Sequence, residues 1–330
     1  MNRMFAWITL AAFIFAASSS LYEADAQIVR YPDSGGRKVR TLQTEGVFVE
    51  TGISEGIIHY VFSGFDPITG AYQNVNVLEI DLDRDNYRVV FNHESPGNIV
   101  SSVAKKYNAI AAVNATYELP AVYCRTNGQN HSEVSLEPGH ERFWKHNAAL
   151  VGDGERQVGI INGASGEEND HTGGLQAISL YKGLDEKNIF ASAPMLIDDY
   201  NPIGTQFVPF FYTKEDLRKL RGEDYRRHQG VRHPRTAVAL TEDNDLLLIV
   251  VDGRVKGKAE GMSAKELTEF IAMHFNPRWA INMDGGGSST MYLKGHGDPS
   301  NNVLNYPTDN RTWDHVGERK VNTHLLVLPK

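Results

Sequence analysis

An aspartate followed by three glycines and two serines is the sharpest chemical feature of the sequence. The run consists of Asp284, Gly285, Gly286, Gly287, Ser288 and Ser289, and it follows a predicted strand that ends near Asn282. Consecutive glycines allow positive φ angles and leave backbone N–H groups exposed, and a concave row of amides suits an anionic ligand. The run therefore predicts an anion site beside a carboxylate. A glycine-rich turn between two strands is the alternative.

A second group of residues suits phosphate binding. Arg232 and Arg235 flank a His-Pro pair at the start of a predicted strand, and Thr236 follows them. Guanidinium groups bind phosphate through paired hydrogen bonds, so we expect the two arginines to hold a phosphate. The alternative is a pair of solvated loop charges.

Further carboxylates stand beside other predicted strands. Asp252 and Arg254 follow the apolar run 246–251, and Glu318 precedes the final strand 321–328. A carboxylate at the end of a buried strand is a frequent active-site placement, but it is equally a common way to open a turn. Asn114 follows another predicted strand, 109–113.

Short strands must position these residues. Alternating or β-branched runs at 57–65, 75–82 and 87–92 predict an antiparallel meander. The hairpin 235–241/246–251 has a continuously apolar second strand, which predicts burial on both faces. Ser263 and Glu266 form a capping box before a helix with one apolar face. We therefore predict an α+β fold, a mixed but largely antiparallel sheet core with flanking helices in one large domain spanning 56–330.

The N-terminal segment predicts export. An apolar run at 5–17 leads to an A-x-A pattern that ends at Ala26, which is typical of a signal peptide over 1–26. Cleavage near Ala26 implies a secreted or periplasmic protein without a stable membrane anchor. We expect residues 27–55 to form a loosely ordered lead-in.

Composition excludes some classes of partner and site. The 330 residues carry a net charge of −8, which argues against a nucleic-acid partner but not against a local cationic pocket. The single cysteine, Cys124, cannot form an internal disulfide. The histidines show no zinc-like spacing. No cofactor is clearly required, and an oxygen-rich Ca²⁺ or Mg²⁺ site stays an alternative.

Taken together and in this order, the segments resemble the phosphodiester glycosidase family. The resemblance lies in VRHPRTAVAL (231–240), LLLIVVDGR (246–254), GMSAKELTEF (261–270), AINMDGGGSSTMYL (280–293) and GERKVNTHLLVL (317–328), with a weaker match around Asn114. It implies hydrolysis of the bond between a sugar's anomeric carbon and a phosphodiester, with an N-acetylglucosamine-type sugar as the expected substrate. Where the family often has glycines after the asparagine, this chain has Ala-Thr-Tyr-Glu at 115–118. The polar segment 118–146, predicted to be a long ordered loop, is a candidate for setting specificity.

The implied chemistry assigns a role to each candidate. A carboxylate must lie beneath the positive charge that develops at C1, and Asp284 is the first choice; Glu318 and Asp252 are candidates for a second carboxylate. The phosphate binders are Arg232, Arg235, Thr236 and Arg254, the amides of Gly285, Gly286 and Gly287, and the hydroxyls of Ser288 and Ser289. Asn114 and Asn282 bind sugar hydroxyls or, with Asp252, help to ligate a metal.

Two other readings of the sequence stay open. One is a phosphodiesterase that cleaves the P–O bond instead of the C–O bond. The other is a non-catalytic envelope protein that binds glycans through aromatic residues such as Tyr117, Trp144 and Trp313.

Overall fold

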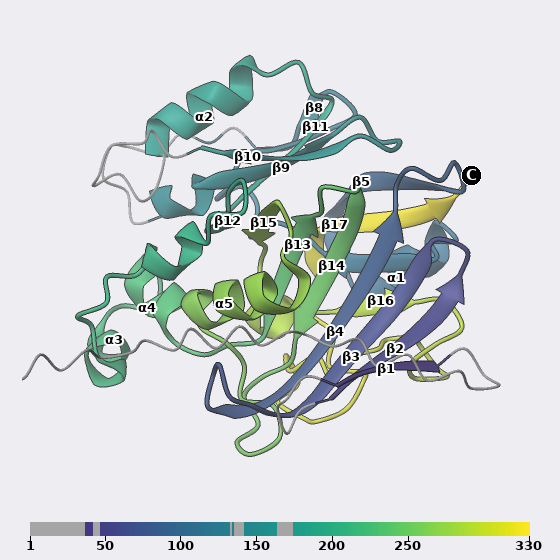
Figure 1. Ribbon diagram of the computed structural model, residues 1–330. Helices are drawn as coiled ribbons and strands as arrows, with labels where there is room; N and C mark the ends of the chain where they lie inside the picture. The colour runs from purple at the N-terminus through teal and green to yellow at the C-terminus, as the bar shows by residue number, and fades with distance from the viewer. Residues whose placement is uncertain (1–36, 42–46, 133, 135–141, 164–173) are drawn as a thin grey trace, which may run out of the picture.

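The computed structural model describes residues 37–41, 47–132, 134, 142–163 and 174–330, and within them the fold is built on three sheets (Figure 1). Every strand pairing in these ranges is antiparallel. Short helices flank the sheets. The predicted α+β class with a largely antiparallel core is confirmed.

The largest sheet has eight strands. In spatial order they are β1 (Arg37–Thr41), β2 (Val47–Ser54), β3 (Ile57–Asp66), β4 (Ala71–Asp81), β14 (Asp245–Val251), β13 (Arg235–Leu240), β15 (Trp279–Asn282) and β12 (Met195–Ile197). The lead-in prediction was wrong for 37–41 and 47–54, since these residues form β1 and β2 at one edge of the sheet. The alternating side chains of β2, such as Phe48, supply the apolar face that a paired strand needs.

Strand β14 is apolar at successive positions because both of its faces are buried. Leu246, Leu248 and Val250 belong to the core on one face of the sheet, and Leu247 and Ile249 belong to the core on the other. Because successive side chains of a strand point to opposite faces, a strand covered on both sides needs an apolar residue at each position. The predicted burial of this strand is confirmed.

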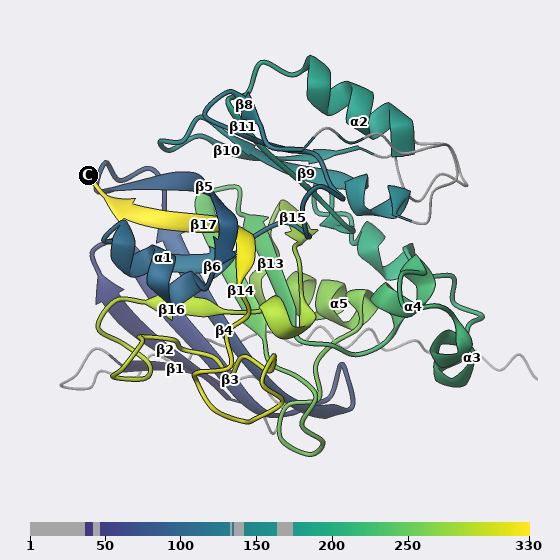
Figure 2. The same cartoon turned by 180° about the vertical axis from the view of Figure 1, so that it is seen from behind.

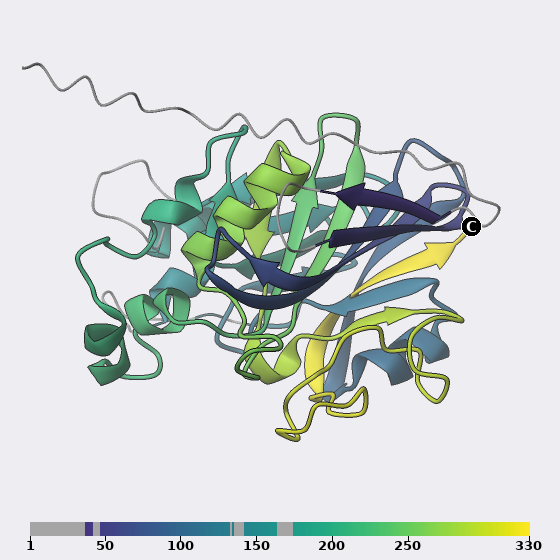
Figure 3. The same ribbon diagram turned by 60° about the horizontal axis from the view of Figure 1, so that its bottom comes forward.

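The two faces of the large sheet are covered differently. Helix α5 (Ala264–Phe275) packs on one face through Leu267, Phe270 and Ile271, and Figure 3 shows it lying across the strands. The predicted capping box is present, because Ser263 Oγ accepts from the Glu266 N–H and the Glu266 carboxylate accepts from the Ser263 N–H.

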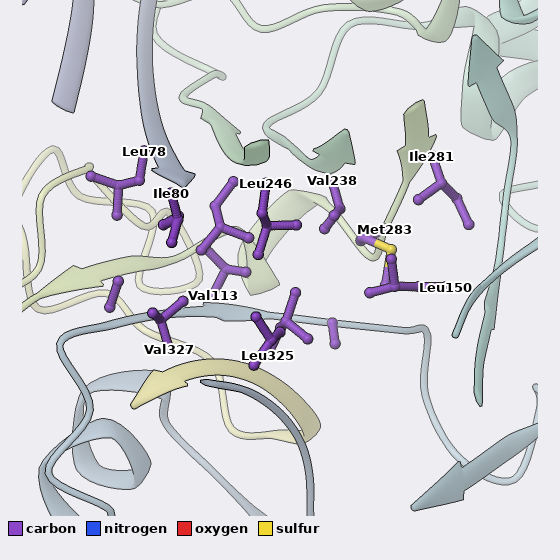
Figure 4. Packing of buried hydrophobic residues seen from close by; sticks show 14 of the residues in the cluster. Leu78, Ile80, Val113, Leu150, Val238, Leu246, Ile281, Met283, Leu325 and Val327 are labelled. Atoms are coloured by element: carbon purple, nitrogen blue, oxygen red, sulfur yellow. The ribbon is translucent and has the colours of Figure 1, made fainter. Parts of the chain in front are cut away.

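A four-stranded sheet covers the other face. Its order is β16 (Met291–Leu293), β6 (Ala111–Asn114), β17 (Val321–Pro329) and β5 (Tyr87–Asn98). Figure 4 shows Leu246 and Val238 of the large sheet pointing toward Leu325 and Val113 of this sheet. Helix α1 (Val100–Lys106) covers its outer side (Figure 2).

The third sheet has five strands and is covered by helix α2 (Gly174–Gly183). Its order is β10 (Val158–Asn162), β9 (Ala148–Gly152), β11 (Asn188–Ser192), β7 (Cys124–Thr126) and β8 (Gln129–Asn130). The segment 118–146 therefore contains two short strands, and the 3-10 helix η1 (Phe143–His146) follows them. It is more regular than the predicted loop because β7 pairs with β11.

The remaining elements are short. They are the 3-10 helix η2 (Ile203–Gln206), helices α3 (Lys214–Lys219) and α4 (Tyr225–Gly230), and the 3-10 helix η3 (Gly286–Ser288) after β15. No helix among the described residues is long and apolar enough to cross a bilayer. The predicted signal peptide, 1–26, lies outside the described residues.

Candidate active site

A cavity of about 970 Å³ lies where the ends of β13 and β15 meet α3, α4 and η1. Its lining is rich in charge of both signs. The cations are Lys145, Lys214, Arg218, Arg227, Arg232, Arg235, Arg254, Arg319 and Lys320, and the carboxylates are Glu118, Glu223, Glu260, Glu266 and Asp284. Nine cations against five carboxylates make the cavity cationic in a chain whose net charge is −8. Such a cavity attracts an anionic ligand.

Asp284 lies in the cavity wall directly after β15. Its backbone N–H donates to Ala115 O at 2.9 Å, and its carboxylate oxygen Oδ1 accepts from the Gly285 N–H at 2.9 Å. Burial raises the pKa of Asp284 to about 6, and the charge of Glu118 adds to the shift. The charges of Lys145 and Arg319 and the Ser288 hydroxyl lower that pKa in part. A carboxylate whose pKa is raised toward neutral pH within a cavity is a candidate for an acid–base or electrostatic role.

The other carboxylates of the cavity make ion pairs. Lys145, whose side chain is only 2% exposed, lies 2.9 Å from Glu118 Oε1 and 3.1 Å from Glu223 Oε2. Its ammonium also lies 5.0 Å from the centre of the Tyr117 ring. Lys145 was not predicted from the sequence, because the segment 118–146 that carries it has no periodicity or motif.

Arg232 makes ion pairs with the other two cavity carboxylates, Glu260 and Glu266. Its Nη2 lies 2.6 Å from Glu266 Oε1 and its Nη1 lies 3.5 Å from Glu260 Oε2. The hydrogen bond to Glu266 raises the pKa of Arg232. Arg232 therefore lines the cavity with its charge already compensated. Asp284 is the cavity carboxylate that makes no ion pair with any described residue.

The glycine run forms a tight turn packed against the His-Pro segment. The N–H of Gly286 donates to Pro234 O at 2.8 Å, and a β-carbon at position 285 would lie 2.7 Å from the same oxygen. Gly286 has φ of +65°, which favours glycine. All three glycines line the cavity, so the predicted row of amides borders the space where a ligand would bind.

The hydroxyls that follow the glycines are buried. Ser288, Ser289 and Thr290 have no hydrogen-bond partner of ordinary geometry among the described residues, and Ser288 lines the cavity. The Ser288 hydroxyl faces the cavity and also acts on the carboxylate of Asp284, whereas Ser289, a predicted phosphate binder, and Thr290 do not line the cavity.

Arg235, a predicted phosphate binder, is buried and hydrogen-bonded to protein groups. It is 1% exposed, and its guanidinium donates to Met262 O at 2.8 Å, Gln229 Oε1 at 2.8 Å, and both His228 O and Val231 O at 3.0 Å. Burial lowers its pKa to about 10. The side chain touches the cavity, but its hydrogen bonds mainly hold the end of α4 in place.

Arg254 is the predicted phosphate-binding arginine whose guanidinium is open to a ligand. It is exposed, makes no ion pair with the described residues, and donates to Thr308 Oγ1 at 3.2 Å. A β-carbon at Gly286 would lie 2.9 Å from its Nη2, so the guanidinium sits directly on the glycine turn. Its neighbour Arg319, which also lines the cavity, is paired with Asp309.

Three other residues predicted to bind the substrate, Asn114, Thr236 and Asn282, lie beneath the glycine turn. Asn114 donates to Asp284 O at 2.7 Å and accepts from Thr236 Oγ1 at 2.8 Å. Asn282 donates to Ala193 O at 2.7 Å and to the Tyr117 hydroxyl at 3.2 Å. All three predicted residues are buried and none lines the cavity, so the structure places them beneath the site.

The two other predicted carboxylates lie outside the cavity. Asp252 is fully buried and accepts from Asn74 at 2.7 Å, from the Asn305 side chain at 3.0 Å and from the Tyr306 N–H at 2.9 Å. Glu318 accepts from the Ser101 N–H at 2.9 Å and so caps helix α1. The structure does not bring either residue together with Asp284.

The phosphodiester glycosidase family model matches residues 107–328, which is most of the chain. The chain belongs to the phosphodiester glycosidase family. The matched range includes Asp284, the glycine turn and all of the residues named above as lining the cavity. A search of curated proteins found no match.

Several solved structures are similar to this chain in fold. One is the catalytic domain of zebrafish N-acetylglucosamine-1-phosphodiester alpha-N-acetylglucosaminidase, auto-inhibited by its pro-peptide, with a TM-score of 0.55 and 17% identity over 83% of each chain. A hypothetical protein from Synechocystis has a TM-score of 0.52 and 14% identity, covering 89% of this chain and 68% of that one. A putative exported protein from Burkholderia pseudomallei has a TM-score of 0.52 and 16% identity, covering 79% and 75%.

Two histidines also line the cavity. Burial lowers the pKa of His228 well below its usual range and that of His233 to about 3, with the charge of Arg235 adding to both shifts. Both rings are therefore neutral at physiological pH. No group of three or more His, Cys, Asp or Glu suited to a metal occurs among the described residues.

Proposed function

We propose that this phosphodiester glycosidase is an exported enzyme that hydrolyses the C1–O bond of a sugar-1-phosphodiester. The products are the free sugar, expected to be of the N-acetylglucosamine type, and a phosphomonoester. The observation that carries the proposal is the combination of one unpaired carboxylate, Asp284, with a cationic wall in a single cavity. An enzyme that separates a cationic sugar centre from an anionic leaving group needs both.

The proposed mechanism divides the two charges between two parts of the cavity. As the C1–O bond breaks, positive charge develops at the sugar ring and is stabilised by the carboxylate of Asp284. The leaving phosphate gains negative charge, which Arg254 and the Gly287 N–H stabilise through charge-assisted hydrogen bonds. Water supplies hydroxide to C1 and its proton ends on the phosphomonoester or the solvent. Because a phosphate monoester is already a good leaving group, protonation of the bridging oxygen contributes less than in an ordinary glycoside.

Two further observations support export of the protein. The apolar run and the A-x-A pattern before residue 27 are typical of a cleaved signal. The solved structure from Burkholderia pseudomallei is described as a putative exported protein.

Hydrolysis in H₂¹⁸O tests which bond is cleaved. With a methyl phosphodiester of N-acetylglucosamine as substrate, we expect the label in the sugar and none in the phosphate, as read by mass spectrometry of both products. Label in the phosphate would show a P–O phosphodiesterase and overturn the proposal. Tight binding without turnover across several sugars would instead support a glycan-binding protein.

The pH profile tests the state of Asp284. Because its ionised form is the one proposed to act, kcat/KM should rise from pH 5 to 7 with an apparent pKa of about 6, falling about tenfold per pH unit below that value. The variant Glu118→Gln removes a charge that raises this pKa, so its profile should shift to lower pH. A profile that falls as pH rises through 6 would show that the protonated acid is the active form.

A further inference from the structure

The cavity contains more uncompensated positive charge than one phosphodiester requires. A phosphodiester carries a single negative charge, and Arg254 at the glycine turn is placed to meet it. Yet Lys214 and Arg218 of helix α3 also line the cavity and make no ion pair with any described residue. A second anionic group on the substrate would account for this excess.

Helix α3 distributes its charges in a way that favours this reading. Lys214 and Arg218 are four residues apart and therefore lie on the same face, where like charges destabilise a helix. On another face, Lys219 Nζ lies 3.0 Å from Glu215 Oε1, which is the stabilising arrangement at the same spacing. The helix thus has its opposite charges paired away from the cavity and its like charges directed to it. An anion bound between Lys214 and Arg218 would relieve their repulsion.

The position of the helix is fixed by packing. Thr213 and Asp216 form a capping box at its start. Leu217 is 4% exposed and lies so close to Gly230 that a β-carbon there would be 2.6 Å from its Cδ1. At the other end, Arg227 Nη1 donates to Leu220 O at 2.6 Å. The backbone that carries Lys214 and Arg218 is therefore held before a ligand binds, which reduces the entropy lost on binding.

This cation pair lies on a different wall from Asp284. Figures 1 and 2 both place α3 beyond α4, away from the strand ends of β13 and β15. Between the two walls, Lys145 is already neutralised by Glu118 and Glu223. The cavity therefore has cations at both walls, Arg254 at the glycine turn and Lys214 with Arg218 at α3.

We propose that Lys214 and Arg218 form a second phosphate subsite, which binds a phosphate group carried by the leaving part of the substrate. The inference rests on the proposed function, since it takes the glycine turn as the place of the scissile phosphodiester. It narrows the substrate class to sugar-1-phosphodiesters whose aglycone is itself phosphorylated, as in a polymer of sugar phosphate units.

Two synthetic substrates that share one sugar and one phosphodiester test the subsite. One has a propyl aglycone and the other a 3-phosphopropyl aglycone. For the double variant K214Q/R218Q, we expect kcat/KM to fall at least about tenfold on the phosphopropyl substrate and to change less than about twofold on the propyl substrate. The matched control K219Q/K265Q removes two exposed cations outside the cavity and should change neither.

Equal losses on both substrates, or no loss on either, would overturn the subsite. If the wild type hydrolyses neither substrate, the proposed function fails for this sugar, and the subsite is then tested by calorimetry with propane-1,3-diyl bisphosphate as ligand. K214Q/R218Q should weaken that binding at least about tenfold relative to K219Q/K265Q, and an unchanged Kd would overturn it. Melting temperatures of all variants show whether each is folded.

Discussion

Replacing Asp284 by asparagine is expected to lower kcat for sugar release at least about 100-fold, the loss typical of removing one acid–base or electrostatic group. Asparagine keeps the size of the side chain and can still accept the hydrogen bond from the Gly285 N–H. The change therefore removes the charge and leaves the turn intact. Steady-state release of free sugar from a sugar-1-phosphodiester measures the effect.

The same variant should be more stable than the wild type at neutral pH. The folded-state pKa of Asp284, about 6, lies above its ordinary value of 3.8, so the ionised carboxylate is disfavoured in the folded chain. Stability linked to this group is therefore highest at low pH and falls as pH rises from about 4 to 6. We expect Asp284→Asn to raise the free energy of unfolding at pH 7 by on the order of 1–3 kcal/mol, and by little at pH 4.

Urea unfolding at the two pH values checks this result. A variant that loses both activity and stability would show that Asp284 holds the structure together, and a variant that keeps its rate would remove Asp284 from the mechanism. Loss of rate with a gain in stability is the combination expected of a residue placed for chemistry at the expense of folding.

Replacing Arg235 by methionine is expected to act on folding. The guanidinium is buried and donates to the carbonyls of Met262, His228 and Val231. Methionine fills part of the space but leaves these acceptors without donors, and each buried unsatisfied group costs about 1–3 kcal/mol. We expect the free energy of unfolding to fall by about 3–5 kcal/mol, measured by urea or thermal unfolding.

Arg254→Met is the matched control for that change. Because Arg254 is exposed and makes no ion pair with the described residues, its loss should alter the free energy of unfolding by less than about 0.5 kcal/mol and should lower kcat/KM for the phosphodiester. If Arg235→Met instead remains as stable as the wild type and only loses affinity for the substrate, Arg235 is a phosphate ligand and its hydrogen bonds to carbonyls are secondary.

The elements of the fold that follow local rules could be predicted from the sequence. The capping box of Ser263 and Glu266 involves residues three apart, and the uninterrupted apolar run of β14 records burial on both faces. The edge strands β1 and β2 were missed, because their mixed polar composition is also typical of a loop. For such a segment, pairing with a neighbouring strand decides the conformation.

The sequence by itself determined the family motifs, the fold class, the glycine turn and its aspartate, since each of these depends on residues close together in the chain. It put Asp284 first but kept Asp252 and Glu318 as candidates for a second carboxylate, because all three stand beside strands. Only the tertiary structure showed that these two lie away from the cavity: Asn74 reaches Asp252 from 178 residues away and Ser101 reaches Glu318 from 217 residues away. A carboxylate's role depends on which donors the fold brings to it, and those donors come from parts of the chain that no local pattern connects.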